Sequence, residues 1–205
     1  MKWTDGVCAL VAAFCVSVPS AQAAAERAGT IEFSLGYNKS WTGSGATGES
    51  LGGGIGAGVA FWRAASPDLS WGLEASYDDL GKVDYSYVDP FSGLTGSTRF
   101  DVRIIRVNPA FRVAFGRPEG ANFLAQVGAG LYNVNLRYRL EAGFIVDDDQ
   151  SETKFAFNVG AGVGFPLGRT KRVNLMAAYH LVNGFDAFIE DFNHVQIRAS
   201  LGIPL

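Results

Sequence analysis

Residues 153–167 read TKFAFNVGAGVGFPL and alternate between two kinds of side chain. The odd positions from Phe155 to Leu167 are all apolar, whereas the even positions from Lys154 to Gly164 are small or polar. A period of two is that of a β-strand, whose successive side chains point to opposite faces. One face of this strand is therefore apolar along its length, and the other can only meet a polar or tightly packed interior. These two faces are typical of a membrane β-barrel.

The same alternation recurs about eight times along the chain. It predicts strands at residues 29–38, 51–62, 68–79, 98–115, 121–139, 153–167, 172–182 and 194–205. The expected connections alternate between short turns (63–67, 116–120, 168–171) and long loops (39–50, 80–97, 140–152, 183–193). Short periplasmic turns and long external loops are characteristic of outer-membrane barrels. We therefore predict an all-β fold, an eight-stranded antiparallel up-and-down transmembrane β-barrel, and weigh a soluble secreted β-sandwich as the alternative.

The first 23 residues have the features of a secretory signal peptide. Lys2 begins a short polar region, residues 7–18 are mostly apolar, and Ala21-Gln22-Ala23 is a small-residue cleavage site. Both cysteines, Cys8 and Cys15, lie in this segment, so the mature chain is expected to contain no cysteine. No later stretch approaches the ~18 consecutive apolar residues of a spanning helix. We expect a signal peptide at residues 1–23, a barrel at 24–205, and a location in the cell outer membrane.

The overall charge argues against a nucleic-acid partner. The formal net charge of the 205 residues is −3, and no basic tract is present. No motif indicates a cofactor or a metal site, so neither is expected. The expected partners are outer-membrane lipids and lipopolysaccharide, with a small hydrophobic ligand as a further candidate, and the protein is expected to be a monomer.

The strand count, the loop asymmetry and the alternation resemble the small eight-stranded outer-membrane barrels, the group of outer membrane proteins A, X and W. The resemblance covers nearly all of residues 29–205. One departure is the C-terminal residue, which is Leu205 where such barrels usually have phenylalanine as an insertion signal. The resemblance implies a structural or surface-interaction role. Its outer membrane protein W branch implies the alternative of a narrow channel or binding protein for small hydrophobic compounds.

Two of the predicted strands change parity partway along. Apolar residues occupy even positions from Phe100 to Ile104 and odd positions from Ile105 to Phe115; the next strand switches between Leu131 and Val134. Both breaks lie about 11 residues above the shared turn, near the outer surface of the bilayer. Each strand could contain a β-bulge. Alternatively, both could run on without a bulge into water, where apolar side chains face inward, and the matching heights favour this second explanation. It predicts an apolar cup at the external mouth, lined by Phe100, Val102, Ile104, Val134, Leu136 and Tyr138.

The alternation also places charged side chains of both signs inside the barrel. These predicted lumen residues are Glu32, Glu74, Arg106, Arg112 and Arg198. They should pair, because an unpaired buried charge is costly, and eight strands leave an interior that side chains can fill. We expect a structural plug of ion pairs, with a gated pore as the alternative.

One short motif bears on catalysis. Residues 179–184, YHLVNG, resemble the His-x-Ser-Asn motif of the lipid A 3-O-deacylases through His180 and Asn183. Val182 stands where that family has serine, and a serine hydrolase needs the hydroxyl beside its base. A deacylase-like enzyme that has lost its serine is therefore the least favoured hypothesis. We expect no catalytic residues and no enzymatic activity.

Overall fold

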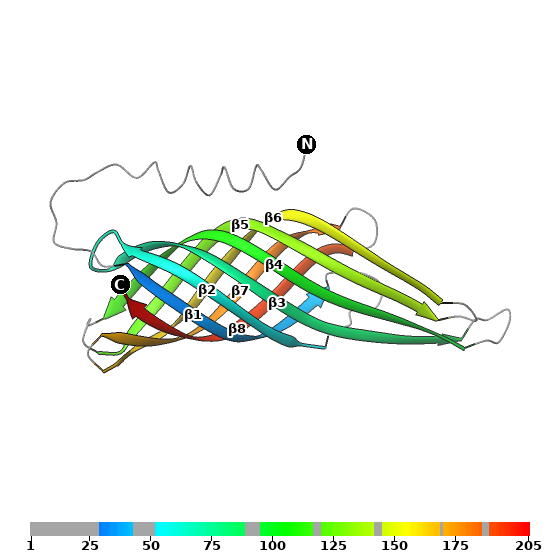
Figure 1. Ribbon diagram of the computed structural model, residues 1–205, viewed down its shortest axis with the longest axis horizontal. Coiled ribbons are helices and arrows are strands. Elements are labelled where there is room, and N and C mark those ends of the chain that lie inside the picture. The colour runs from blue at the N-terminus through cyan, green and yellow to red at the C-terminus, as the bar shows by residue number, and fades with distance from the viewer. Residues whose placement is uncertain are drawn as a thin grey trace.

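The computed structural model describes residues 29–42, 52–88, 95–116, 120–141, 145–168, 170–185 and 189–205. These residues form eight strands: β1 (Thr30–Thr42), β2 (Gly54–Ala64), β3 (Leu69–Val88), β4 (Thr95–Gly116), β5 (Asn122–Glu141), β6 (Ile145–Leu167), β7 (Lys171–Phe185) and β8 (Ile189–Pro204). Each strand pairs antiparallel with its neighbours in sequence, and β1 pairs with β8, which closes the barrel (Figure 1). The predicted eight-stranded antiparallel barrel is confirmed. No helix of the described residues is long and apolar enough to cross a membrane.

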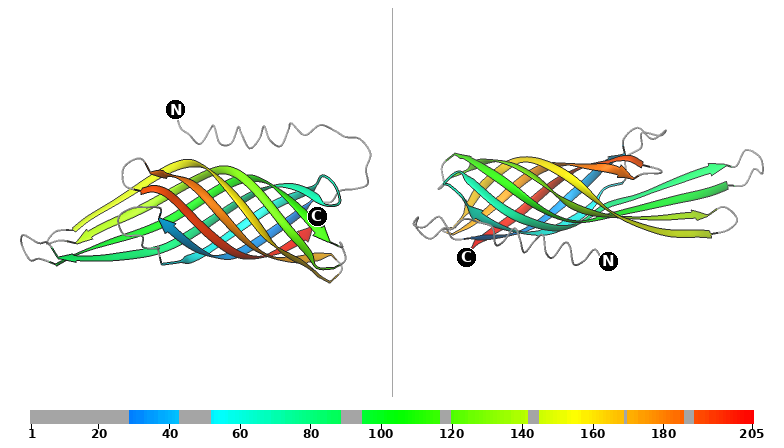
Figure 2. Two further views of the ribbon diagram at one scale, coloured as in Figure 1. Left: turned by 180° about the vertical axis from the view of Figure 1, so that it is seen from behind. Right: turned by 90° about the horizontal axis from the view of Figure 1, so that it is seen from above.

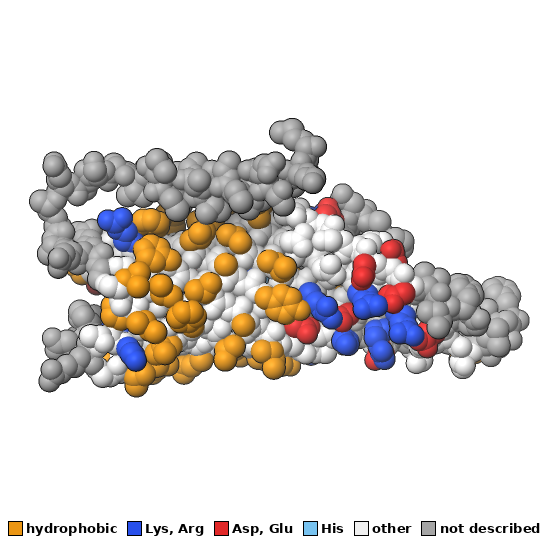
Figure 3. All heavy atoms as spheres, in the orientation of Figure 1, with side chains coloured by type: hydrophobic (Ala, Val, Ile, Leu, Met, Phe, Trp, Pro, Cys, Tyr) orange, Lys and Arg blue, Asp and Glu red, His pale blue; other side chains and the backbone are white. Residues whose placement is uncertain are grey.

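The outer surface of the barrel has two chemically different zones. Towards the end with the short turns, apolar side chains such as Phe111, Phe157 and Leu175 are about half exposed, and exposed apolar side chains of all eight strands form a belt. Figure 3 shows apolar side chains gathered at this end of one face. Towards the other end, charged side chains replace them on the surface shown in Figure 3. We call these the turn end and the loop end. The register pair Thr30↔Pro204 places the start of β1 and the end of β8 together at the turn end.

The four strands β3–β6 project beyond the belt at the loop end (Figure 2). β3 continues to Val88 and β4 begins at Thr95, while β6 already begins at Ile145. The predicted loops 80–97 and 140–152 are therefore wrong at residues 80–88, 95–97, 140–141 and 145–152, which are strand, and residues 89–94 and 142–144 lie outside the described residues. In water a strand needs no apolar outer row, so the signal that marks a membrane strand is missing here. In the predicted loops 39–50 and 183–193, residues 39–42, 183–185 and 189–193 are strand, and residues 43–50 and 186–188 lie outside the described residues.

We call this part of β3–β6 the projecting sheet; it comprises residues 82–88, 95–103, 133–141 and 145–153. Its strands keep the barrel register. The β4–β5 pairs run from Ser97↔Glu141 to Gly116↔Asn122 without a shift. The predicted parity breaks are therefore not bulges in β4 and β5.

A β-bulge does occur in β3. Asp79 pairs with Arg103 and Lys82 with Asp101, so Leu80 and Gly81 lie opposite a single residue of β4. Gly81 has a φ of +89°, a backbone conformation that side chains disfavour, and its N–H donates to Asp79 Oδ1 at 2.7 Å. The bulge reverses the parity of β3, so that Lys82 and its even-numbered successors face outward with the charged side chains of β4.

Candidate functional site

The barrel interior contains three layers of buried polar contacts, of which the first lies nearest the turn end. Arg112 donates from Nη1 to Glu32 Oε2 at 2.6 Å and from Nη2 to Glu32 Oε1 at 3.3 Å. Its guanidinium carbon lies 3.9 Å from the centre of the Trp62 ring. Ser200 Oγ also donates to the Glu32 carboxylate. This layer joins β1, β2, β4 and β8, so one ion pair links opposite parts of the wall.

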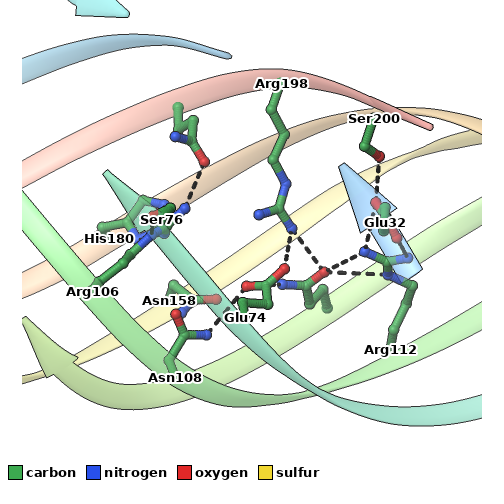
Figure 4. A network of polar contacts seen from close by, with 12 residues as sticks. Glu32, Glu74, Ser76, Arg106, Asn108, Arg112, Asn158, His180, Arg198 and Ser200 are labelled. Carbon is green, nitrogen blue, oxygen red and sulfur yellow. Dashed lines mark hydrogen bonds and ion pairs between the residues drawn. The ribbon is translucent and has the colours of Figure 1, made fainter. Parts of the chain in front are cut away.

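The second layer is centred on Glu74 (Figure 4). Arg198 Nη2 donates to Glu74 Oε1 at 2.7 Å, and the amides of Asn108 and Gln126 donate to Oε2 at 3.2 and 3.0 Å. Gln126 Oε1 accepts hydrogen bonds from both Arg112 and Arg198 at 3.1 Å, which connects the first two layers. All of these side chains are buried, so both carboxylate oxygens of Glu74 have partners.

The third layer is centred on Arg106 and contains a partner that the sequence analysis missed. Arg106 Nε lies 3.1 Å from Asp78 Oδ2, and its Nη2 donates to Gln196 Oε1 at 2.8 Å. Asp78 also accepts from Asn38 and Gln196. Asp78 follows Glu74 by four residues on the same strand, so continuing the even parity of β3 would have found it. The expected strand ended one residue later, and its last inward position was overlooked.

The two histidines of the chain lie above this layer. His180 and His194 stack with ring centroids 4.3 Å apart and an interplanar angle of 4°. Tyr132 Oη lies 2.9 Å from His180 Nδ1, and Arg106 Nη1 lies 2.8 Å from the same nitrogen. Both histidines are buried inside the barrel, so His180 does not reach surrounding lipid. Among the described residues, no group of three or more His, Cys, Asp or Glu side chains could hold a metal ion.

An apolar cluster closes the interior above the histidines. Val102, Ile104, Val134 and Leu136 are buried there with Leu80, Tyr132, Ala156 and Val182, and Phe100 packs against them partly buried. Phe100 and Tyr138 are in contact, with ring centroids 5.2 Å apart. The structure thus places the six residues of the proposed cup on the inner face. It also shows that the part of the cup nearest the histidines is filled by side chains from β3, β6 and β7, which the sequence analysis did not include.

Two cavities of very different size lie inside the barrel. One cavity among the central polar layers, lined by Glu74, Arg106 and Arg198, has a volume of about 10 Å³, which is about the space of one water molecule. A second cavity of about 320 Å³ opens at the turn end and is lined by Trp62, Arg112 and Arg172, among others. The larger of these two cavities is therefore a vestibule at the turn end, and the smaller one lies among the polar layers above it.

The outer face of the projecting sheet carries a ladder of ion pairs between neighbouring strands. Arg99 Nε lies 2.6 Å from Asp84 Oδ1, and Arg137 Nη2 lies 2.7 Å from Asp147 Oδ2. The hydrogen bond from Arg137 lowers the pKa of Asp147, and the pKa values of Arg99 and Arg137 are raised by hydrogen bonds to their partners. Figure 3 shows acidic and basic side chains gathered beside the apolar belt, over the end of the molecule that projects.

Comparisons with known proteins support this architecture. The structure resembles that of Neisserial surface protein A, with 12% identity and a TM-score of 0.58 over 86% of this chain and 97% of that chain. It also resembles a major outer membrane protein from Thermus thermophilus, with 11% identity and a TM-score of 0.51 over 85% of this chain and 99% of that chain. At these identities the likeness concerns the fold alone. Comparison with curated proteins gives no match.

The sequence itself identifies the family. Residues 7–202 match the outer membrane protein beta-barrel domain, and the closed barrel with its apolar belt is the structure that such a sequence requires. The turn end then corresponds to the periplasmic side and the loop end to the cell exterior. The chain belongs to the outer membrane protein β-barrel domain family and is a β-barrel protein of the outer membrane.

Proposed function

We propose that this protein is a closed barrel whose role is structural or surface-interaction, with the projecting sheet as its external contact surface. The observation that carries the proposal is the filled interior. Three polar layers built on Glu32, Glu74 and Arg106 lie beneath an apolar cluster, and a cavity among the central layers has a volume of only about 10 Å³. The lumen ion pairs hold the wall closed, while the charged projecting sheet is the part that other molecules can reach.

Closure is tested by solute uptake into liposomes that carry the refolded protein. We expect neither a small sugar nor a small hydrophobic dye to enter faster than into protein-free liposomes, because buried side chains occupy the polar layers. Liposomes with an open porin serve as the positive control. Sugar uptake by the wild-type protein would contradict the closed barrel.

The surface role is tested by shortening the projecting sheet. Lys82 and Asp101 lie directly opposite each other, so an Asn-Gly turn can replace residues 83–100 with a two-residue hairpin. Arg137 and Asp149 allow the same replacement of residues 138–148. We expect cells with the shortened protein to keep a folded barrel and to lose any adhesion to epithelial layers that the wild type confers. Unchanged adhesion would contradict the role of the sheet.

A second candidate is a narrow channel or binding protein for small hydrophobic compounds. Phe100 and Tyr138 favour it, because they are only partly buried and continue the inner apolar face beyond the buried cluster. Uptake of the hydrophobic dye by the wild type, lost in a Leu136→Arg variant, would replace the closed barrel with this function. No uptake by either protein would remove the candidate.

We propose further that residues 1–23 are a signal peptide and that residues 24–205 form the mature protein. The apolar run and the Ala21-Gln22-Ala23 site support this division. The mass of the protein purified from outer membranes should correspond to a chain that begins at Ala24. A mass that includes Met1 would contradict it.

A further inference from the structure

The vestibule at the turn end has the size of a binding site for a small molecule. Its volume is about 320 Å³, and small-molecule sites in proteins have volumes of about 300–1,000 Å³. Its inner limit is the first polar layer, in which Arg112 and Glu32 neutralise each other (Figure 4). A molecule that enters from the periplasmic side therefore reaches this layer without passing through the barrel.

One side of the vestibule is a polar wall formed by the ends of β5, β6 and β7. Asn122 of β5 pairs with Gly164 of β6, which pairs with Asn174 of β7. A Cβ atom added to Gly164 would meet Asn122 Oδ1. The same atom would lie 2.8 Å from Asn174 Oδ1 and 3.5 Å from Arg172 Nη2. Three polar groups therefore converge on one residue, because that residue has no side chain.

The polar wall contains an acceptor and a cation that a ligand can use. Among the described residues, Asn122 Oδ1 is buried and accepts no hydrogen bond. A rotation of this amide towards a donor in the vestibule breaks no hydrogen bond of the oxygen, and it removes the cost of a buried acceptor without a partner. Arg172 Nη2 donates to Gly120 O at a long 3.4 Å. Because a guanidinium has several N–H donors, Arg172 can bind a carboxylate as well.

The other side of the vestibule carries apolar side chains and an acidic rim. Ala64 of β2, Ala114 of β4 and Leu124 of β5 line it. Asp68 lies at the rim, in the connection that leads into β3. In the closed order of eight strands, β3 is four strands from β7, so Asp68 and Arg172 lie on opposite sides of the mouth. A carboxylate is therefore directed to the polar wall, and an apolar group to the other side.

We propose that the vestibule binds a small α-amino or α-hydroxy acid from the periplasm. Arg172 binds the carboxylate, and the neighbouring ammonium or hydroxyl group of the ligand donates to Asn122. The side chain of the ligand lies against the apolar side, and the volume of about 320 Å³ limits the ligand to about the size of one amino acid. The site is separate from the projecting sheet, so this proposal goes beyond the function proposed above.

The test is isothermal titration calorimetry of the wild-type protein in phosphatidylcholine nanodiscs, which leave both ends of the barrel open to solvent. Empty nanodiscs correct for partition of the ligand into lipid. We expect phenylalanine, phenyllactate or both to bind, and the tighter of the two identifies the donor. Phenylpropionate lacks the donor and should bind at least about threefold more weakly. Phenylalaninol lacks the carboxylate and should bind at least about tenfold more weakly.

Two results of this ligand series would overturn the proposal. One is no binding of either phenylalanine or phenyllactate. The other is binding of phenylpropionate or phenylalaninol as tightly as the better of these two acids, because the carboxylate and its neighbouring donor would then not both be recognised.

A matched pair of variants locates the site. Arg172→Gln removes a cation that lines the vestibule, whereas Lys171→Gln removes one from the preceding, exposed position of β7. We expect Arg172→Gln to weaken binding of the tighter acid at least about tenfold and Lys171→Gln to change it less than about twofold. Equal losses would show general charge attraction and would overturn the site.

A second variant keeps the test decisive if Arg172→Gln does not fold. Gly164→Ala places a methyl group against Asn122 Oδ1 and should also weaken binding of the tighter acid; unchanged binding would contradict the proposal. Ligand binding is measured separately from solute uptake and from adhesion, so its failure leaves the closed barrel and the role of the projecting sheet standing.

Discussion

The parts of β4 within the apolar belt and in the projecting sheet use the same two faces with opposite chemistry. Arg106 and Ile104 are consecutive inward residues, one in the polar layers and one in the apolar cluster. Ile105 and Arg103 are consecutive outward residues, one in the belt and one in the charged ladder. No register shift in the β4–β5 pairing separates them. The backbone fixes where each side chain points, and the surrounding medium decides which polarity belongs there.

Single substitutions in the polar layers inside the barrel should lower the free energy of unfolding the most. Glu74→Ala leaves the guanidinium of Arg198 buried without its carboxylate, and removal of one partner of a buried ion pair costs about 3–5 kcal/mol. We expect a loss of that size in the free energy of unfolding, measured by urea titration of the protein in lipid vesicles.

The control for this substitution is the double variant Glu74→Met with Arg198→Met. Removal of both charges should recover part of the loss, because no uncompensated charge then remains in the interior. A double variant less stable than Glu74→Ala would show that the hydrogen bonds to Asn108 and Gln126 dominate the layer instead of the ion pair.

For apolar residues of β4, the loss of stability should depend on whether the side chain faces the interior or the lipid. Ile104 is fully buried, whereas Ile105 is 57% exposed in the belt. Ile104→Ala creates a cavity and should cost about 2–4 kcal/mol of unfolding free energy. Ile105→Ala should cost less, because lipid chains can fill the space. The same urea titration compares the two, and a larger loss for Ile105→Ala would reverse the assignment of the faces.

The exposed ion pairs of the projecting sheet should shift the pKa values of the paired residues but contribute little to the free energy of unfolding. Because the pKa of Asp147 is lowered, the contribution of this carboxylate to stability is present above the ordinary pKa of an aspartate, about 4. It disappears as the pH falls through the lowered pKa. Carboxyl ¹³C shifts should show this pKa return towards its ordinary value in Arg137→Gln. The unfolding midpoint should not change, since exposed pairs contribute little; an unchanged Asp147 pKa in the variant would contradict the pairing.

The sequence predicted most where lipid sets the pattern. In β6, apolar residues such as Phe155 and Phe157 alternate with small or polar ones because one face of the strand meets lipid and the other meets the interior, so the strands and the inward charges could be read directly. Asp78 was missed because the last inward position of the expected strand 68–79 was overlooked, although it continues the even parity of Glu74. The strands of residues 98–103 and 133–139 were predicted, but residues 82–88, 95–97 and 145–152 of the projecting sheet were read as loop, since charges on their outward face resemble those of a solvated connection. The partners of Ile104 could not be predicted, because pattern alone does not show which side chains from β3, β6 and β7 reach the same layer.

Cysteine labelling tests the continuous inner face of β4 most directly, and the absence of cysteine after residue 15 makes each introduced thiol unique in the proposed mature chain. Single cysteines at positions 103, 104 and 105 would be treated in liposomes with a membrane-impermeant maleimide. The structure predicts rapid labelling at 103 and slow labelling at 104, which is buried, and at 105, which faces lipid. A lipid-soluble maleimide should label 105 and not 104. Labelling of 104 from lipid, with 105 protected from both reagents, would show that the face reverses and that β4 contains a bulge.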